Sequence, residues 1–310
     1  MRPTHLIDRA LASTLPAVPR PLVRHFADRY MAGESLADAV EAVRVLNAAD
    51  IEATVDVLGE DATGADQVQA TVREYERLLA AIQEHGLRST ISVKLSALGL
   101  EIDPAMAREN ARRLAAEAGR RGSFMRIDME HSGLTDATLD IYRELREAGL
   151  EQVGIVLQAY LRRSLSDVRD LADLRPSVRL VKGIYVEPQA IAYTDPGIIN
   201  RNFLELLGEL LGNGSRVAVA THDRWLVDEA LRLIDRRRLA PEAYEFQMLL
   251  GVTEALRGQL VAQGHPMRVY VPYGSAWYAY SVRRLRENPS IAGYVARDIA
   301  RSFVPGLSRG

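Results

Sequence analysis

The feature that most constrains the fold is an alternation of short β-prone runs with amphipathic helical stretches, which begins near Ala53. The runs that we predict as strands are 54–58, 90–95, 124–129, 154–158, 178–183, 217–220, 244–249 and 269–271. The helical stretches between them include 66–85, 104–120, 139–149 and 224–236. Strict alternation favours parallel pairing, and about eight such units in this length predict an α/β fold, a (β/α)8 TIM-type barrel.

A doubly wound α/β sheet is the main structural alternative. Its nucleotide-binding form needs a glycine-rich turn between a strand and the following helix. The glycine pair that comes nearest, Gly212 and Gly214, precedes a predicted strand and lacks the later glycine. A nucleotide cofactor would therefore be held in another way.

The first fifty residues have a different pattern, with apolar positions at helical intervals and no β-prone runs. Ser35 is placed to cap a helix over 36–49. We therefore expect a helical segment, 1–50, that packs on a catalytic barrel formed by 51–310, with the whole chain as a single domain.

Composition excludes several classes of function. The 310 residues carry a net charge of −2, which gives no electrostatic footprint for nucleic acid. The chain has no cysteine, and its six histidines have no ligand spacing, so we expect no disulfide, no thiolate nucleophile and no metal site. The N-terminus lacks the apolar core of a signal peptide, and no apolar run approaches the roughly 18 residues of a membrane span. A cytoplasmic protein is expected, with peripheral contact at the inner face of the membrane left open.

The segment 268–290 combines a strand, a turn and a helix, and concentrates aromatic and basic side chains. Ser275 is placed to cap a helix that runs to Asn288, with Pro289 ending it. Spacing at i, i+3, i+4 and i+7 puts four side chains on one face of this helix: Tyr280, Arg283, Arg284 and Glu287. This face is either the wall of a binding site or an ordinary solvated surface.

Most predicted strands end in polar side chains, and in a TIM-type barrel the catalytic groups gather at those ends. In chain order they are Glu60, Lys94, Asp128, Gln158, Arg179, Tyr185, Thr221, His222, Glu245, Gln247 and Tyr270. Burying Lys94 or Asp128 alone would be very unfavourable, whereas an opposite charge or a charged ligand would compensate. A structural network of Lys94, Asp128 and Glu245 inside the barrel is the alternative to an active site.

Eight motifs resemble, in order, the strand motifs of the flavin-dependent proline dehydrogenases. They are VDVLGE, SVKLSALG, RIDMEHS, VLQAY, RLVKGIY, ATHD, YEFQMLLG and RVYVPYG with YSVRRLREN, which together span nearly everything from Glu52 to Ser290. The resemblance implies an FAD-containing (β/α)8 barrel of the monofunctional bacterial type, from the family that includes the proline dehydrogenase domain of proline utilization A. It implies oxidation of L-proline to Δ1-pyrroline-5-carboxylate, the first step from proline to glutamate. Electrons would pass to a membrane quinone, and a separate pyrroline-5-carboxylate dehydrogenase would take the product.

The resemblance also implies roles for individual residues. Substrate binding would involve Lys94, Leu249, Tyr270, Tyr280, Arg283, Arg284 and Glu287, with Lys94 and the two arginines on the carboxylate. Flavin binding would involve Gln158, Arg179, Gly183, Tyr185, Thr221 and His222. Asp128 and Tyr185 would be active-site residues alongside Lys94, Arg283 and Arg284, and Glu60 would pair with Arg283 in the open site. Which group accepts the amine proton stays open.

Two positions depart from the family pattern, and two other functions remain to be weighed. Val186 stands where many members have an aromatic residue, and Ser275-Ala276-Trp277 replaces a Thr-His pair of the larger bifunctional relatives. A Schiff-base aldolase barrel could use Lys94 or Lys182 as a nucleophile. The second alternative function is that of a catalytically silent barrel that binds an anion.

Overall fold

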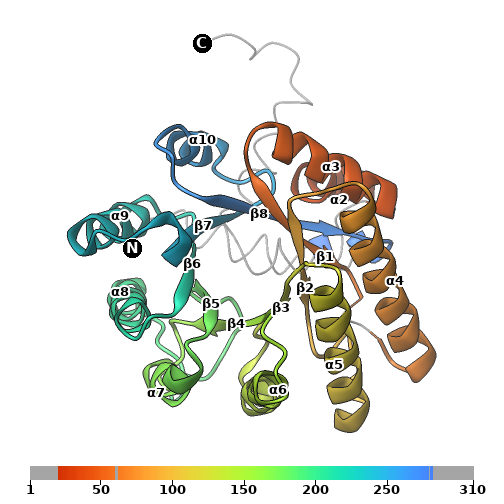
Figure 1. Ribbon diagram of the computed structural model, residues 1–310, viewed down its shortest axis with the longest axis horizontal. Helices are drawn as coiled ribbons and strands as arrows, with labels where there is room; N and C mark the ends of the chain where they lie inside the picture. Colours follow the sequence, from red (N-terminus) through yellow and green to blue (C-terminus); the bar gives the residue numbers. More distant parts are fainter. Residues whose placement is uncertain (1–19, 60–61, 279, 282–310) are drawn as a thin grey trace.

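The computed structural model describes residues 20–59, 62–278 and 280–281, and its centre is a closed barrel of eight parallel strands. Figure 1 shows the strands at the centre and the helices in a ring around them. The strands follow one another in sequence order around the barrel, and β8 closes it against β1. They are β1 (Glu52–Val57), β2 (Ser89–Val93), β3 (Met125–Ile127), β4 (Val153–Gln158), β5 (Ser177–Val181), β6 (Arg216–Ala220), β7 (Tyr244–Leu249) and β8 (Met267–Tyr273). The predicted TIM-type fold and all eight predicted strands are confirmed.

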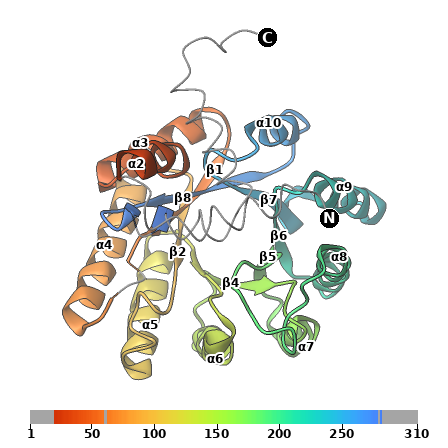
Figure 2. The same cartoon turned by 180° about the vertical axis from the view of Figure 1, so that it is seen from behind.

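The outer ring consists of helices that follow the strands, as the same barrel seen from behind in Figure 2 also shows. They are α4 (Ala65–Glu84), α5 (Pro104–Arg120), α6 (Thr135–Glu147), α7 (Ser164–Asp170), α8 (Pro196–Gly212), α9 (Arg224–Arg237) and α10 (Glu254–Ala262), with short 3-10 turns at η2 (Ser132–Leu134), η3 (Ala172–Leu174) and η4 (Pro241–Ala243). Asp103, Asp195 and Asp223 begin α5, α8 and α9 by accepting hydrogen bonds from backbone N–H groups in the first turn. These caps fix where each helix begins beyond its strand. No helix in the described ranges is long and apolar enough to cross a membrane.

Two helices precede the barrel, α2 (Arg20–Tyr30) and α3 (Leu36–Ala48), and they lie between α4 and α10 in Figure 1. The side chains of Ser35 and Asp38 form a reciprocal capping box at the start of α3, which confirms the predicted cap. The linker between α2 and α3 is tied to the end of β8, since Ala32 N–H donates to Pro272 O and Gly274 N–H donates to Gly33 O. The helical segment is therefore attached where β8 leaves the barrel.

The two faces of the strands carry different chemistry. Side chains alternate along a strand, and Val55, Ile91 and Val271, which lie side by side on β1, β2 and β8, belong to the hydrophobic core that also contains helix residues. On most strands the alternate residues are polar, and several of them contact one another across the barrel, whereas β4 and β6 place Val156 and Ala218 at such positions. Arg179 of β5 donates to Ser92 Oγ of β2 at 3.0 Å, although these strands are not neighbours. The apolar core thus lies between strands and helices, and the interior of the barrel is polar.

Candidate active site

Lys94 occupies the centre of a polar cluster just beyond the end of β2. Its Nζ donates to Asp56 Oδ2 at 2.8 Å and to Tyr270 OH at 3.2 Å, and it lies 3.8 Å from Asp128 Oδ2. Asp56 also accepts a hydrogen bond from Tyr75 OH at 3.0 Å. One ammonium is therefore shared between two buried carboxylates at the C-terminal ends of β1, β2 and β3, where a TIM-type barrel places its active site.

Asp128 accepts hydrogen bonds from three strands. Arg179 Nη1 donates to its Oδ1 at 2.5 Å, Ser92 Oγ donates to the same oxygen at 2.8 Å, and Tyr270 OH donates to Oδ2 at 2.9 Å. Burial by itself would raise the pKa of Asp128, but the charges of Arg179 and Lys94, with the hydrogen bonds from Ser92 and Tyr270, outweigh it and lower the pKa below its ordinary value. Asp128 is therefore a fixed anion at neutral pH.

Tyr270 is the neutral hydrogen-bond partner within this cluster. Burial raises its pKa well above the ordinary value, and the nearby charges of Asp128 and Asp56 raise it further. The phenol keeps its proton, which it donates to Asp128 while its oxygen accepts from Lys94. Its ring also lies 5.2 Å from the guanidinium carbon of Arg179. Tyr270 thus links the ammonium to the guanidinium.

Arg179 is buried, and it is bound on two of its three nitrogens. Nε donates to Gln247 Oε1 at 2.6 Å, and Nη1 donates to Asp128 and Ser92. Nη2 is buried and has no hydrogen-bond partner among the described residues. A buried N–H group without a partner costs about 1–3 kcal/mol, so this nitrogen marks a place where a ligand acceptor would be stabilised.

Four other predicted cofactor residues lie on the neighbouring strand ends. Gln158 is buried and donates from Nε2 to Glu130 O at 2.9 Å. His222 Nε2 accepts from Leu249 N–H at 3.0 Å, which assigns the proton of the neutral ring to Nδ1. Thr221 Oγ1 accepts from Asp223 N–H at 3.1 Å. Gly183 has a φ of +110°, and a Cβ there would collide with the ring of Tyr160.

The loop after Gly183 differs from what strand alternation would suggest. β5 ends at Val181, so Tyr185 lies in the loop, where its ring makes an edge contact with His131 at 6.4 Å between centroids. Val186, which replaces an aromatic residue of the family pattern, is 98% exposed. The structure therefore brings Tyr185 to the same end of the barrel as the Lys94 cluster and gives Val186 no contact that explains its identity.

Tyr280 is within electrostatic range of Tyr270 and packs against the N-terminal segment. It is buried against Ala27 and Met31 of the N-terminal segment and Leu58 after β1, with Trp277 packed beside them. The described residues 277, 278, 280 and 281 are helical, so the predicted helix begins close to Ser275. Glu60 and the residues predicted to bind the carboxylate from this helix, Arg283, Arg284 and Glu287, lie outside the described residues.

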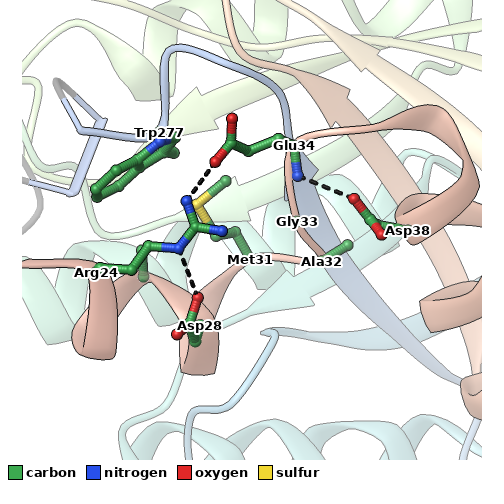
Figure 3. A pocket seen from close by; sticks show the side chains of 9 residues that line it. Arg24, Asp28, Met31, Ala32, Gly33, Glu34, Asp38 and Trp277 are labelled. Carbon is green, nitrogen blue, oxygen red and sulfur yellow. Dashed lines mark hydrogen bonds and ion pairs between the residues drawn. The ribbon is translucent and has the colours of Figure 1, made fainter. Parts of the chain in front are cut away.

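A hollow of about 340 Å³ adjoins this helix start, and Figure 3 shows its lining. Arg24 lies over the ring of Trp277 at 4.9 Å and pairs with Asp28 at 3.0 Å and with Glu34. The residues lining the hollow belong to α2, the following linker, α3 and the segment after β8, and none of them is in the Lys94 cluster. The hollow is thus a feature of the seam between α2 and Trp277, and it is separate from the candidate site.

Sequence reasoning missed two members of the site, Asp56 and Ser92. Each is the last but one residue of its strand, and sequence analysis selected only the polar residues that follow these strands, Glu60 and Lys94. The signal that could have found them is alternation, since Ser92 precedes Lys94 by two residues on the same inward face. Sequence analysis grouped Glu245 with Lys94 and Asp128. In the structure Glu245 lies nearer the N-terminal ends of the strands, where it pairs with Arg268.

The arrangement can bind an anion and a polar ring. Lys94 and Arg179 supply cationic donors, and Gly183 lets the ring of Tyr160 lie against the backbone after β5. Within the part of the chain that the structure describes, no group of three or more acidic or histidine residues could hold a metal ion. Lys182, the second candidate nucleophile, pairs with Asp223 at 2.6 Å.

Comparisons with known sequences agree with the motifs. The family model described as "Proline dehydrogenase" matches residues 39–297. The chain is 38% identical over 281 residues to the proline dehydrogenase of Deinococcus radiodurans, which covers 89% of this chain and 91% of that protein. It is 36% identical over 275 residues to proline dehydrogenase 1 of Bacillus subtilis, with 89% of this chain and 91% of that protein covered.

Among solved structures, the barrel superposes on part of a larger protein. Proline utilization A from Bdellovibrio bacteriovorus, in a crystal structure inactivated by N-propargylglycine, superposes with a TM-score of 0.80 at 26% identity. The superposition covers 91% of this chain and 36% of that one, so this chain spans about a third of its length. By the extent and identity of the sequence matches, the chain belongs to the proline dehydrogenase family, a family of oxidoreductases that act on proline.

Proposed function

We propose that this protein oxidises L-proline to Δ1-pyrroline-5-carboxylate with bound FAD and passes the electrons to a membrane quinone. The observation that carries the proposal is Arg179, a buried cation held on two sides with one nitrogen left for a ligand, next to Lys94 at the active-site end of the barrel. Family membership supports the same reaction class. In proline catabolism to glutamate, a separate pyrroline-5-carboxylate dehydrogenase would consume the product.

The residues fit a flavin. Arg179 Nη2 and the Nδ1–H of His222 are donors suited to the oxygen and nitrogen edges of an isoalloxazine or to a pyrophosphate. Gln158, Thr221 and Tyr185 would complete the polar contacts, and Gly183 would contribute through its backbone, since the ring of Tyr160 fills the space where a Cβ would lie. When bound, FAD supplies the hydride acceptor for the carbon beside the proline nitrogen.

The chain's own residues would bind and orient proline. Lys94 would contact the carboxylate together with Arg283 and Arg284, whose forked donors fix the plane of a carboxylate. Tyr270, Tyr280 and Leu249 would enclose the apolar ring, and Glu287 would hold the arginines in place. Orientation of this kind lowers the barrier because the reacting carbon is held where hydride leaves.

Holding Lys94 between two carboxylates argues against the aldolase alternative. A Schiff-base nucleophile must present a neutral amine with its lone pair directed at a carbonyl carbon. Here the Nζ of Lys94 donates to Asp56 and Tyr270 with Asp128 close by, which is the geometry of an ammonium that binds anions. A substrate adduct trapped on Lys94 by borohydride would restore the aldolase reading.

Two further expectations belong to the proposal. The unit 51–310 would be the catalytic barrel, with the helical segment 1–50 packed on it. The protein would work in the cytoplasm, with peripheral contact at the inner face of the membrane, where the quinone acceptor resides.

The visible spectrum of the purified protein tests the proposal. The protein should be yellow, and L-proline added without oxygen should bleach it. The proline analogue tetrahydro-2-furoic acid, which carries the carboxylate and ring but no amine, should slow the bleaching by competition. A preparation without flavin that cannot be reconstituted with FAD would contradict the proposal.

A further inference from the structure

A line of buried polar side chains runs from the N-terminal ends of the barrel strands to Arg179. Arg268 of β8 pairs with Glu52 and donates from Nε to Glu245 Oε1 at 3.0 Å. Gln247 donates from Nε2 to Glu245, and its Oε1 accepts from Arg179 Nε at 2.6 Å. The contacts therefore connect β1, β8, β7 and β5 through the interior of the barrel.

The amide of Gln247 has one orientation that satisfies both of its neighbours. Arg179 can only donate, so it needs the carbonyl oxygen of Gln247. Burial by itself would raise the pKa of Glu245, but Arg268 and Arg216, with the hydrogen bond from Gln247, lower it to about 2. Glu245 is therefore an ionised acceptor that needs the NH2 group of Gln247. A flipped amide would set donor against donor and acceptor against acceptor.

This bridge controls the rotation of the Arg179 guanidinium. Asp128 and Ser92 both bind Nη1, so these two contacts alone would let the group pivot about that nitrogen. The contact of Gln247 with Nε adds a second anchor on another side of the plane. Two anchors fix a planar group, and the direction of Nη2 follows from them.

A purely structural role does not explain the pattern of satisfied groups. Replacing buried ion pairs by apolar side chains is often neutral or stabilising, so burying Arg268, Glu245 and Arg179 is a costly way to fill a barrel. The side-chain nitrogens and oxygens of Arg268, Glu245 and Gln247 are not among the buried atoms without a partner, whereas Nη2 of Arg179 is. The network is thus complete except where it meets the candidate site.

We propose that Glu245 and Gln247 are positioning residues for the reaction, which together aim Nη2 of Arg179 at the flavin ring. The inference rests on the proposed function, because it takes the flavin as the ligand of Arg179. Neither residue would touch substrate or cofactor. Their effect would be to fix a positive charge and one donor where the flavin gains electrons.

The test uses Gln247→Met, which keeps the length of the side chain and removes the acceptor, and Arg216→Gln as the matched control. Arg216 also binds Glu245, at 3.1 Å, but its side chain is half exposed, and it begins β6 beside Ser177, two residues before Arg179 along β5. The readouts are the dissociation constant of FAD, the midpoint potential of the bound flavin and the melting temperature. Gln247→Met should weaken FAD binding roughly ten- to hundredfold, the range for losing a hydrogen bond to a charged group, and make the potential more negative. Arg216→Gln should stay within about twofold of wild type.

Exchange of the two residues provides a rescue. Gln247→Glu alone would face Glu245 with a like charge, whereas the double variant with Glu245→Gln lets the amide at position 245 accept from Arg268 and donate to the carboxylate at 247. That carboxylate would still accept from Arg179. The double variant should bind FAD more tightly than Gln247→Glu alone.

The outcomes distinguish a failure of the positioning role from a failure of the proposed function. Wild-type FAD affinity and potential in folded Gln247→Met would overturn the inference, as would losses that Arg216→Gln shares in proportion to its melting temperature. A double variant that binds FAD no better than Gln247→Glu would also contradict it. A wild-type protein unable to bind FAD would overturn the proposed function, and this inference with it.

Discussion

The outward and inward faces of the same eight strands differ in what they contribute. Phe246 and Gln247 are consecutive residues of β7, and both are buried. Phe246 belongs to the hydrophobic core with residues of the surrounding helices, while Gln247 binds Arg179 and Glu245 inside the barrel. The outward face supplies apolar burial, the main favourable term in folding. Burying the charged groups of the inward face costs desolvation free energy, and these groups form an ordered set of hydrogen-bond donors and acceptors.

The largest effect on stability is expected on the outward face. Phe246→Ala would leave a cavity in the core and should lower the free energy of unfolding by about 3–5 kcal/mol. Gln247→Met, on the inward face of the same strand, should lower it by about 1–3 kcal/mol, the cost of leaving a buried donor unpaired. Chemical denaturation of both variants measures the difference. Equal losses of unfolding free energy in the two variants would contradict the distinction between the two faces.

Activity should depend more on the candidate site than on the apolar core. We propose that Lys94 and Arg284 bind the proline carboxylate, so Lys94→Met and Arg284→Met should each remove one cationic partner, at a typical cost of about 2–5 kcal/mol. We expect kcat/KM for proline to fall by roughly one and a half to three and a half powers of ten, while flavin content stays near wild type. Steady-state kinetics and the visible spectrum check both parts. If both variants turned over proline within about twofold of wild type, the assignment of the carboxylate site would be wrong.

Acid should act on the inward face through Glu245. Its pKa is about 2 in the folded protein against an ordinary value of 4.5, so folding favours the ionised form. The resulting stability, on the order of 3 kcal/mol, is fully present above about pH 4.5 and is lost as the pH falls toward about 2. The stability difference between wild type and Glu245→Gln should therefore shrink over that range. A difference that does not change with pH would contradict the assigned charge.

The smallest effect is expected at exposed ion pairs. Arg112 and Glu109 lie one turn apart on α5 with side chains more than half exposed, at 2.9 Å. Arg112→Gln should change the free energy of unfolding by less than about 0.5 kcal/mol, because exposed pairs are screened by solvent. Thermal melts of this variant beside Glu245→Gln would sharpen the contrast between a surface pair and a pair inside the barrel.

The fold was predictable from the sequence because each level of the pattern agreed. The β-prone runs and helical stretches alternate, and caps such as Ser35 and Asp103 stand where the helices begin. Strand ends were predicted less well, since 269–271 marks only the centre of β8, which spans Met267–Tyr273. The flanking Met267, Arg268 and Tyr273 are held in the strand by pairing with β1 and β7, which local sequence does not reveal.

The site was predictable in part. Sequence analysis selected Lys94, Asp128, Arg179 and Tyr270, and the structure brings these four together, although Arg179 and Tyr270 lie in the middle of their strands. Asp56 and Ser92 were not selected, because one polar residue within a β-prone run says little until its partner across the barrel is known. Tyr185 could not be placed by alternation, because the chain leaves the strand at Val181.

The central claim is that the inward face holds the flavin through Arg179, and the affinity for FAD in two arginine variants tests it most directly. Arg126 is also buried inside the barrel, but it lies lower and bonds to Ile155 O at 3.1 Å and to Ser177. Arg179→Met should weaken FAD binding roughly ten- to hundredfold, whereas Arg126→Met should bind FAD within about twofold of wild type, with cooperative melts showing that both are folded. Equal FAD affinity in folded Arg179→Met and wild type would contradict the account.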